Sequence, residues 1–245
     1  QAGTDLAALK TKAEWVGNRF VINGMKIWTS YSYKADWCFL LARTGPERKA
    51  ISCFLVPMNS PGIIVVPFPG LPEYGHLNEV FFQDVEVPAA NMIGEVGRGW
   101  DIITYALSYE RVGLPRYHWG RMVLDTAVAQ LQREGRFDDP IVRAHAGRIV
   151  AKFEAARILT YVVVDQRVKN SPPTVDANIQ RVTAAEGCLD LMNFLMEFLP
   201  DSLAGGERYL ELFYRHQIPA TIAAGTFELQ LDLIAQRGLG LPRGR

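Results

Sequence analysis

The sequence predicts an α+β protein of two parts, an antiparallel β-barrel or β-sandwich over residues 1–92 and a four-helix bundle over residues 93–245. Up to about residue 90, apolar residues come in short runs that glycine, proline and asparagine separate. From about Gly97, apolar residues instead recur every three or four positions, which is the helical period. Because no helical pattern interrupts the first part, a parallel βαβ sheet is not expected there.

The strands of the first part are bounded by residues that favour turns. They are expected over residues 36–42, 51–57, 62–68 and 79–87. Before them, Asn23-Gly24 separates two strand-like stretches within residues 19–30. Asn-Gly readily adopts the positive φ angles of a tight turn, so the sequence predicts a β-hairpin centred on this pair.

The second part contains a clear helix start at Asp139-Pro140, where an N-cap residue precedes a proline at the first helical position. The spacing predicts a buried face made of Val142, Ala146, Ile149, Phe153, Ala156 and Thr160. The two prolines that follow Asn170-Ser171 end this helix.

Further helices are expected toward the end of the chain. One covers residues 175–199, with Ile179, Val182, Leu189, Met192 and Met196 on its buried face. Shorter helices cover residues 209–217 and 227–236, and Gly238 suits the end of the last one. Several helices joined by short breaks are typical of a bundle.

Composition excludes several classes of function. The 245 residues include 26 basic and 26 acidic side chains, and zero net charge argues against nucleic-acid or anionic-membrane binding. Three scattered cysteines fit neither a disulfide framework nor a zinc site, and no metal is expected; a reducing compartment is favoured. No apolar stretch approaches the roughly 20 residues that span a bilayer.

General motifs reveal little chemistry. The sequence has no phosphate loop, G-x-G-x-x-G, H-E-x-x-H or G-x-S-x-G. One residue is unusual, because Glu110 lies in the apolar stretch 102–114, where desolvation would raise its pKa as a general base near neutral pH requires. From the residues alone, an ion pair with Arg111 or Arg116 explains Glu110 more simply.

Four segments carry a resemblance when taken together. They read A-G-T-D-L-A at 2–7, N-G-M-K-I-W-T-S at 23–30, L-N-E-V-F-F-Q-D-V-E-V-P at 77–88 with N-M-I-G at 91–94, and I-A-A-G-T at 222–226 with Gln230 and I-A-Q-R at 234–237. In this order they resemble signatures of the acyl-CoA dehydrogenase flavoprotein family. The resemblance implies the middle β domain and the C-terminal bundle of that family, with a helical domain of ~120 residues missing upstream.

The resemblance implies FAD-dependent α,β-dehydrogenation of an acyl-CoA thioester. In this chemistry a carboxylate removes the α-proton while the β-hydrogen leaves as hydride to the flavin. Many members take the base from a Y-E-G-T signature, where this chain has Ala224. In the isovaleryl- and long-chain-type branch the base belongs to an acidic-Arg pair, which Glu110-Arg111 resembles. Glu110 is therefore the expected base, and Ala224 is expected to offer only its backbone N–H to the thioester carbonyl.

The same resemblance assigns the binding residues. Those expected to bind FAD are Trp28, Thr29 and Ser30 at the ring, and Thr226, Phe227 and Glu228 at the phosphate and ribitol region. Those expected on the substrate side are Thr4, Ser108, Tyr109, Arg111, Ala224 and Gly225. Gly225 would allow close backbone approach.

The chain departs from the family where a neighbouring subunit normally completes the flavin site. The family's R-x-x-F-G loop corresponds to a shorter loop over residues 133–140, and Gly205-Gly206 lies too late for the family's Q-x-x-G-G-x-G-Y. These departures favour a hetero-oligomer, α2β2, with a paralogous acyl-CoA dehydrogenase subunit. By analogy, it resembles split-site enzymes of actinobacterial steroid side-chain degradation. In the alternative, a homo-oligomer, Arg136 or Arg143 would take over the phosphate role.

The sequence leaves two further functions open. The chain could be a non-catalytic partner subunit, although loss of the neighbour-side contacts argues against that. It could also be an acyl-CoA oxidase, which differs in fast reoxidation of its flavin by oxygen. As a dehydrogenase it would pass electrons to an electron-transfer flavoprotein or a similar acceptor, and a role in lipid metabolism in the bacterial cytoplasm is expected.

Overall fold

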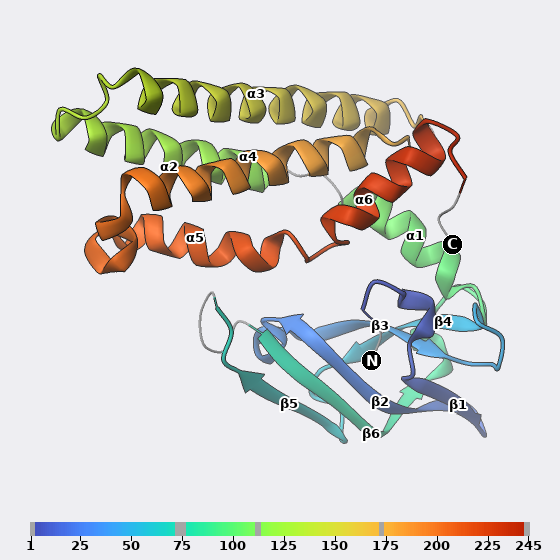
Figure 1. Cartoon of the computed structure of the whole chain (residues 1–245). Coiled ribbons are helices and arrows are strands. Elements are labelled where there is room, and N and C mark those ends of the chain that lie inside the picture. Colours follow the sequence, from blue (N-terminus) through green and yellow to red (C-terminus); the bar gives the residue numbers. More distant parts are fainter. Residues whose placement is uncertain (1–2, 72–76, 111–113, 172–173, 243–245) are drawn as a thin grey trace. The chain divides into compact units, whose positions relative to one another are not determined.

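The computed structural model describes residues 3–71, 77–110, 114–171 and 174–242, with only the backbone of Ser108, Glu110, Leu114 and Pro115. Contacts divide the chain into two compact units, Gln1–Leu107 and Ser108–Arg245. The first, the sheet unit, holds the strands, and the second, the helical unit, holds the bundle (Figure 1). The domain boundary expected after residue 92 stays a prediction.

The sheet unit contains a seven-stranded sheet in the order β5-β6-β2-β1-β3-β4-β7. The strands are β1 (Lys12–Val16), β2 (Arg19–Ser30), β3 (Trp37–Arg43), β4 (Ile51–Pro57), β5 (Ile63–Phe68), β6 (Leu77–Pro88) and β7 (Met92–Ile93). Neighbouring strands are antiparallel except β1 and β3, which meet in parallel where Lys12 pairs with Arg43. The predicted antiparallel strands are thus confirmed.

The hairpin predicted at Asn23-Gly24 is wrong. β2 runs without a break through this pair and bonds to β6 on both sides of a β-bulge. Asn23 holds the bulge, because its Oδ1 accepts from the Asp84 N–H and its Nδ2 donates to the Asp84 carboxylate, both at 2.9 Å. Gly24 is required here because a Cβ would lie 2.7 Å from the Thr11 Cα. The tight turn lies instead between β1 and β2, at Gly17-Asn18.

Helix α1 (Gly99–Glu110) begins against the sheet. A Cβ on Gly99 would lie 2.7 Å from the Ile51 carbonyl oxygen, so the helix start packs directly on β4. The apolar residues of its first turns, Trp100, Ile102 and Ile103, pack against buried residues of the sheet unit. This packing explains why most of α1 groups with the sheet rather than with the later helices.

The helical unit confirms the predicted four-helix bundle. It is made of α2 (Leu114–Arg133), α3 (Pro140–Val168), α4 (Asp176–Phe198) and α5 (Arg208–Ala220), followed by α6 (Phe227–Leu233). In Figure 1, α2, α3 and α4 run side by side, and contacts among them confirm this packing. Asp139 caps α3 by accepting from the Ile141 N–H at 2.8 Å, and every residue predicted for the buried face of α3 is buried.

The predicted buried face of α4 is largely wrong, because only Met192 of the five residues is buried. Leu189 and Met196 are exposed. The buried stripe instead contains small residues, Ala184, Ala185, Gly187 and Cys188, beside Leu191. Small side chains let α4 approach α3 closely. Apolar residues of α4 occur on every face of the helix, so periodicity alone could not identify the buried face.

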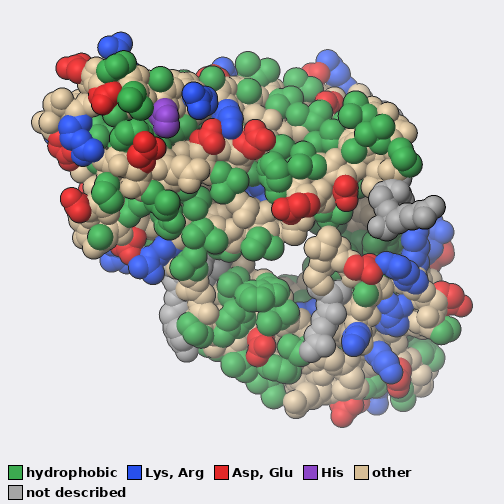
Figure 2. All heavy atoms as spheres, in the orientation of Figure 1, with side chains coloured by type: hydrophobic (Ala, Val, Ile, Leu, Met, Phe, Trp, Pro, Cys, Tyr) green, Lys and Arg blue, Asp and Glu red, His purple; other side chains and the backbone are tan. Residues whose placement is uncertain are grey.

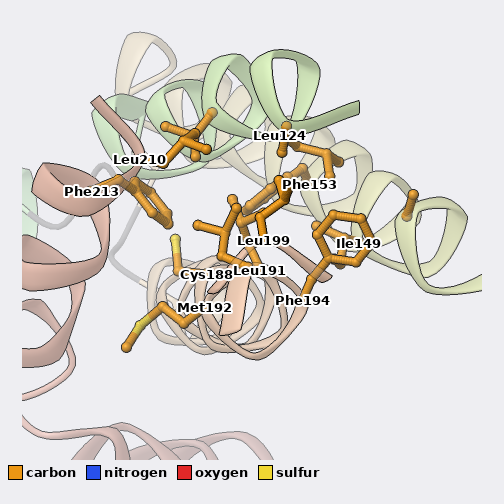
Figure 3. Packing of buried hydrophobic residues seen from close by; sticks show 14 of the residues in the cluster. Leu124, Ile149, Phe153, Cys188, Leu191, Met192, Phe194, Leu199, Leu210 and Phe213 are labelled. Atoms are coloured by element: carbon orange, nitrogen blue, oxygen red, sulfur yellow. The ribbon is translucent and has the colours of Figure 1, made fainter. Parts of the chain in front are cut away.

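Phe153 fills the space between three helices. A Cβ on Gly120 of α2 would lie 2.4 Å from its Cζ, and one on Gly187 of α4 would lie 2.8 Å from its Cε1. Phe153 is 1% exposed, and Figure 3 shows it among the packed side chains of α4, including Leu191 and Phe194. The bundle therefore depends on two glycines at this crossing.

Gly120→Ala should lower the free energy of unfolding by about 1–3 kcal/mol, because the added methyl overpacks against Phe153. Gly147→Ala on the exposed face of α3 is the matched control, since a Cβ there meets no atom within 4 Å. It should raise stability by up to about 1 kcal/mol through helix propensity. Denaturant unfolding followed by circular dichroism measures both, and equal stability of the two variants would contradict this packing.

Lys26 of β2 is a second buried feature with a testable consequence. Its Nζ donates to the Leu41 carbonyl at 2.8 Å, and burial lowers the pKa of Lys26 from 10.5 to about 8. Between these two values the unfolded chain binds more protons than the folded chain, so the contribution of Lys26 to stability rises with pH. The native protein should therefore gain stability relative to Lys26→Met between about pH 8 and pH 10.5. Parallel pH profiles of the two proteins would contradict this burial.

Candidate functional site

The sheet unit presents one predicted site segment on a second β-bulge. Lys26 pairs with Val80 and Thr29 with Asn78, so two residues of β2 face one residue of β6. Trp28 lies in this bulge with φ +64°, a conformation that non-glycine residues rarely adopt. A bulge bends its strand and redirects a side chain, and Trp28 is 64% exposed.

The contacts of this segment hold the indole outward. The Trp28 ring meets the Phe68 ring edge-on, with centroids 5.3 Å apart. The carbonyl of Thr29 accepts from the Nδ2 of buried Asn78 at 3.0 Å, and Ser30 pairs with Leu77. Positive φ at an ordinary residue costs about 1–3 kcal/mol and clusters at functional sites. The bulge therefore offers a flat apolar surface that the protein core does not use.

The helical unit presents the other predicted segment in the turn between α5 and α6. Ala224 and Gly225 have φ +58° and +91°, and Thr226 caps α6 by accepting from the Leu229 N–H at 3.3 Å. Within the described part of the chain, the N–H groups of Ala224 and Gly225 have no acceptor. Phe227 and Glu228 form the first turn of α6. This turn thus presents two unused backbone donors.

Gln230 supports the turn from inside the helical unit. It is completely buried, and its Nε2 donates to the carbonyls of Ala224 and Gly225, each at 3.4 Å. Its Oε1 accepts from the Nδ2 of Asn178 at 2.7 Å, which fixes the orientation of the amide. A Cβ on Gly225 would lie 2.4 Å from the Gln230 Nε2, so only glycine permits this approach.

Two arginines hold the same turn at its start. Nη2 of Arg181 donates to the carbonyls of Ala220 and Ala223, and Nη1 of Arg116 donates to Ala220 at 2.6 Å. Burial, followed by the nearby Arg116 charge, lowers the pKa of Arg181 to about 10, so it stays charged at neutral pH. The sequence analysis did not identify Arg181. The signal that could have identified it is a basic residue at helical spacing from Ala184 and Cys188, on the buried face of α4.

The predicted base lies at the end of α1. Glu110 is the last residue of this helix, and its side chain, like that of Ser108, lies outside the described residues, as does all of Arg111. The carbonyl of Tyr109 accepts from Nη1 of Arg167 at 2.7 Å, and the Arg167 guanidinium lies 5.4 Å from the Tyr109 ring centroid. Arg167 of α3 thus anchors the backbone next to Glu110.

In the sheet unit, the predicted substrate-side residue Thr4 is exposed.

The far end of the bundle brings the loop after α2 near the turn after α4. The residues lining the hollow between them are Gln130, Arg133, Glu134, Asp201, Ser202, Gly206 and Glu207. Glu134 accepts from Gln130 at 2.9 Å and from Arg136 at 3.0 Å, contacts that lower its pKa. Arg136 is therefore engaged by a carboxylate, and carboxylates outnumber arginines in this hollow. Such a lining disfavours an anion.

The rest of the described surface carries charges of both signs. In Figure 2, acidic and basic side chains are scattered among hydrophobic ones over the visible face of the helical unit. Among the described residues, no three His, Cys, Asp or Glu side chains lie together as metal ligands would. None of the helices in that part of the chain is long and apolar enough to span a membrane.

Relatives place the chain in a family. The model of the acyl-CoA dehydrogenase middle domain matches residues 1–85, and that of the C-terminal domain matches residues 97–239. Acyl-CoA dehydrogenase IpdE1 of Mycobacterium tuberculosis is 33% identical over 99% of this chain, and acyl-CoA dehydrogenase FadE26 of the same organism is 32% identical over 99%. The chain spans 65% of the length of IpdE1 and 66% of FadE26.

Solved structures agree with these matches. The structure described as the Tcur3481-Tcur3483 steroid ACAD has a TM-score of 0.87 at 30% identity, covering 99% of this chain and 66% of that one. The ChsE4-ChsE5 complex from Mycobacterium tuberculosis has a TM-score of 0.82 at 31% identity, covering 99% and 67%. Sequence and structure lead to the same conclusion: the chain belongs to the acyl-CoA dehydrogenase family.

Proposed function

We propose that this chain carries the catalytic residues of a FAD-dependent acyl-CoA dehydrogenase, with Glu110 as the base that removes the α-proton. The observation that supports this most is the turn at Ala224. Its N–H groups at Ala224 and Gly225 have no acceptor within the described residues and could serve a thioester carbonyl, but the side chain of Ala224 is a methyl group that cannot accept a proton. The base must therefore come from elsewhere, and the acidic-Arg pair at Glu110 is the available candidate.

Each unit contains a segment suited to part of a flavin. The exposed indole of Trp28, held on a strained bulge, offers an apolar face for a planar ring, with Thr29 and Ser30 beside it. Thr226, Phe227 and Glu228 begin α6, where backbone N–H groups favour phosphate. When bound, FAD supplies the acceptor for the β-hydride. Electrons would then pass to an electron-transfer flavoprotein or a similar acceptor.

The backbone of the turn would activate the substrate. An N–H at Ala224 that donates to the thioester oxygen stabilises the negative charge that develops as the α-proton leaves. A carboxylate in an apolar setting is a stronger base for that proton than one in water. Thr4, Ser108, Tyr109, Arg111 and Gly225 would line the substrate side. Because related structures are described as a steroid ACAD, steroid acyl-CoA thioesters are the first substrates to test.

We further propose that a paralogous subunit completes the flavin site. The hollow at the end of the bundle carries Glu134, Asp201 and Glu207, which would repel a pyrophosphate from another copy of this chain. Arg136, one of the two arginines that would bind the phosphate in a homo-oligomer, is engaged by Glu134. Two related structures, Tcur3481-Tcur3483 and ChsE4-ChsE5, are described as pairs of proteins. An α2β2 assembly fits these observations.

Glu110→Gln should abolish catalysis while leaving FAD bound. A neutral amide cannot take the α-proton, so anaerobic reduction of the flavin by acyl-CoA should slow roughly 100-fold or more. The experiment uses the full-length gene product, co-expressed with a paralogous acyl-CoA dehydrogenase chain from the same organism, and follows loss of the visible absorbance of oxidised flavin. Glu95→Gln, on an exposed loop before α1, is the control and should reduce at the native rate.

Three outcomes would contradict the assignment. Reduction by Glu110→Gln at the native rate would show that the base lies elsewhere, as in a non-catalytic supporting subunit. Loss of FAD from the variant would show a structural role for this residue. Rapid reoxidation of the reduced native flavin by oxygen would show that the enzyme is an acyl-CoA oxidase rather than a dehydrogenase.

The gene product expressed alone should retain little FAD, because its own copies lack the phosphate contacts. Co-expression with the partner should restore bound FAD, measured as the ratio of flavin to protein absorbance after gel filtration. Tight FAD binding by a homo-oligomer of this chain would overturn the split site and favour Arg143 as the phosphate ligand.

A further inference from the structure

Arg181 is a buried cation whose acceptors are backbone carbonyls. The residue is 5% exposed, and among the described residues no carboxylate lies within ion-pair distance of it. Its Nη2 donates to the carbonyls of Ala220 and Ala223, while its Nε has no partner in that part of the chain. Burying a charge without an ion-pair partner is unfavourable, so the position calls for a reason other than stability.

A second guanidinium, that of Arg116, raises the electrostatic cost of burying Arg181. Arg116 donates to the same Ala220 oxygen at 2.6 Å, so two like charges converge on one carbonyl. Their repulsion adds to the unfavourable burial of Arg181. A planar guanidinium, however, can bind two carbonyls in a fixed geometry that a lysine ammonium cannot match. The contacts of these two arginines therefore fix the orientation of the turn's carbonyl groups but lower the stability of the fold.

Arg181 fixes the orientation of the Ala224 N–H through the peptide group that joins Ala223 and Ala224. In a trans peptide the C=O of one residue and the N–H of the next point in opposite directions. Because Arg181 binds the Ala223 carbonyl at 3.0 Å, the Ala224 N–H of the same peptide points away from Arg181. Gln230 acts likewise on the next peptide, since it binds the Ala224 carbonyl and so directs the Gly225 N–H.

We propose that Arg181 is a positioning residue that orients the Ala224 N–H toward the thioester carbonyl of the substrate. It acts through the Ala223 carbonyl and touches neither substrate nor flavin. The assignment rests on the proposed dehydrogenase function. It explains why the chain keeps a buried charge, with no ion-pair partner among the described residues, beneath a turn whose own side chains have no acid or base.

The first test measures the turn itself, without any substrate. Hydrogen–deuterium exchange of the FAD-loaded complex should rise about tenfold in residues 221–226 for Arg181→Met and by less for Arg181→Lys. Exchange in α3 should not change. Arg121→Met is the matched control, since Arg121 is a partly exposed arginine of the bundle paired with Asp125, and it should leave the turn unaltered.

The second test measures the reaction. The limiting rate of flavin reduction should fall about 10- to 100-fold in Arg181→Met, with FAD content and KM nearly unchanged, because the lost donor orientation matters most in the transition state. Added guanidinium should restore part of the rate of Arg181→Ala.

Unchanged exchange in residues 221–226, or exchange rising equally throughout the bundle, would overturn the positioning role. So would a local rise in exchange with no change in rate. If no acyl-CoA bleaches the native flavin, the proposed function fails, whereas the exchange result still shows whether Arg181 holds the turn.

Discussion

The turn between α5 and α6 depends on hydrogen bonds to its carbonyl oxygens. Arg181 and Gln230 bind carbonyls from the buried side, and the N–H groups of Ala224 and Gly225 remain without acceptors in the described chain. Positive φ at Ala224, a non-glycine residue, is otherwise unfavourable, so buried side chains must impose this conformation. A backbone held in this way can bind an oxygen atom with little reorganisation, which is what stabilisation of a developing charge requires.

In the sheet unit, a buried polar side chain likewise holds the backbone at the bulge that contains Trp28. An extra residue in β2 forces positive φ at Trp28, while buried Asn78 fixes the neighbouring carbonyl. In both places a polar side chain inside the fold holds the backbone, and a strained residue faces outward. Family signatures include both segments, and the structure supplies the physical reason: the signature glutamine, Gln230, supports the turn, and the signature tryptophan, Trp28, lies in the bulge.

Much of the fold could be predicted from sequence, because local patterns determine it. The cap at Asp139 and the buried face of α3 follow from helical spacing. The bulge at Asn23 could not be predicted, because it depends on Asp84, a residue of another strand. For the site, the resemblance pointed to Ala224, but the role proposed for Arg181 requires knowing that α4 packs beneath the turn. The role proposed for Glu110 rests on the resemblance and on the methyl group at Ala224.

Moving the base between these two positions tests the division of roles most directly. We expect Glu110→Gln alone to leave the FAD of the complex oxidised on anaerobic addition of an acyl-CoA substrate. Adding Ala224→Glu to that variant should restore measurable reduction, since the turn then offers a carboxylate where many family members have one. Reduction of the Glu110→Gln variant alone at the native rate, or no recovery of reduction in the double variant, would contradict this division of roles.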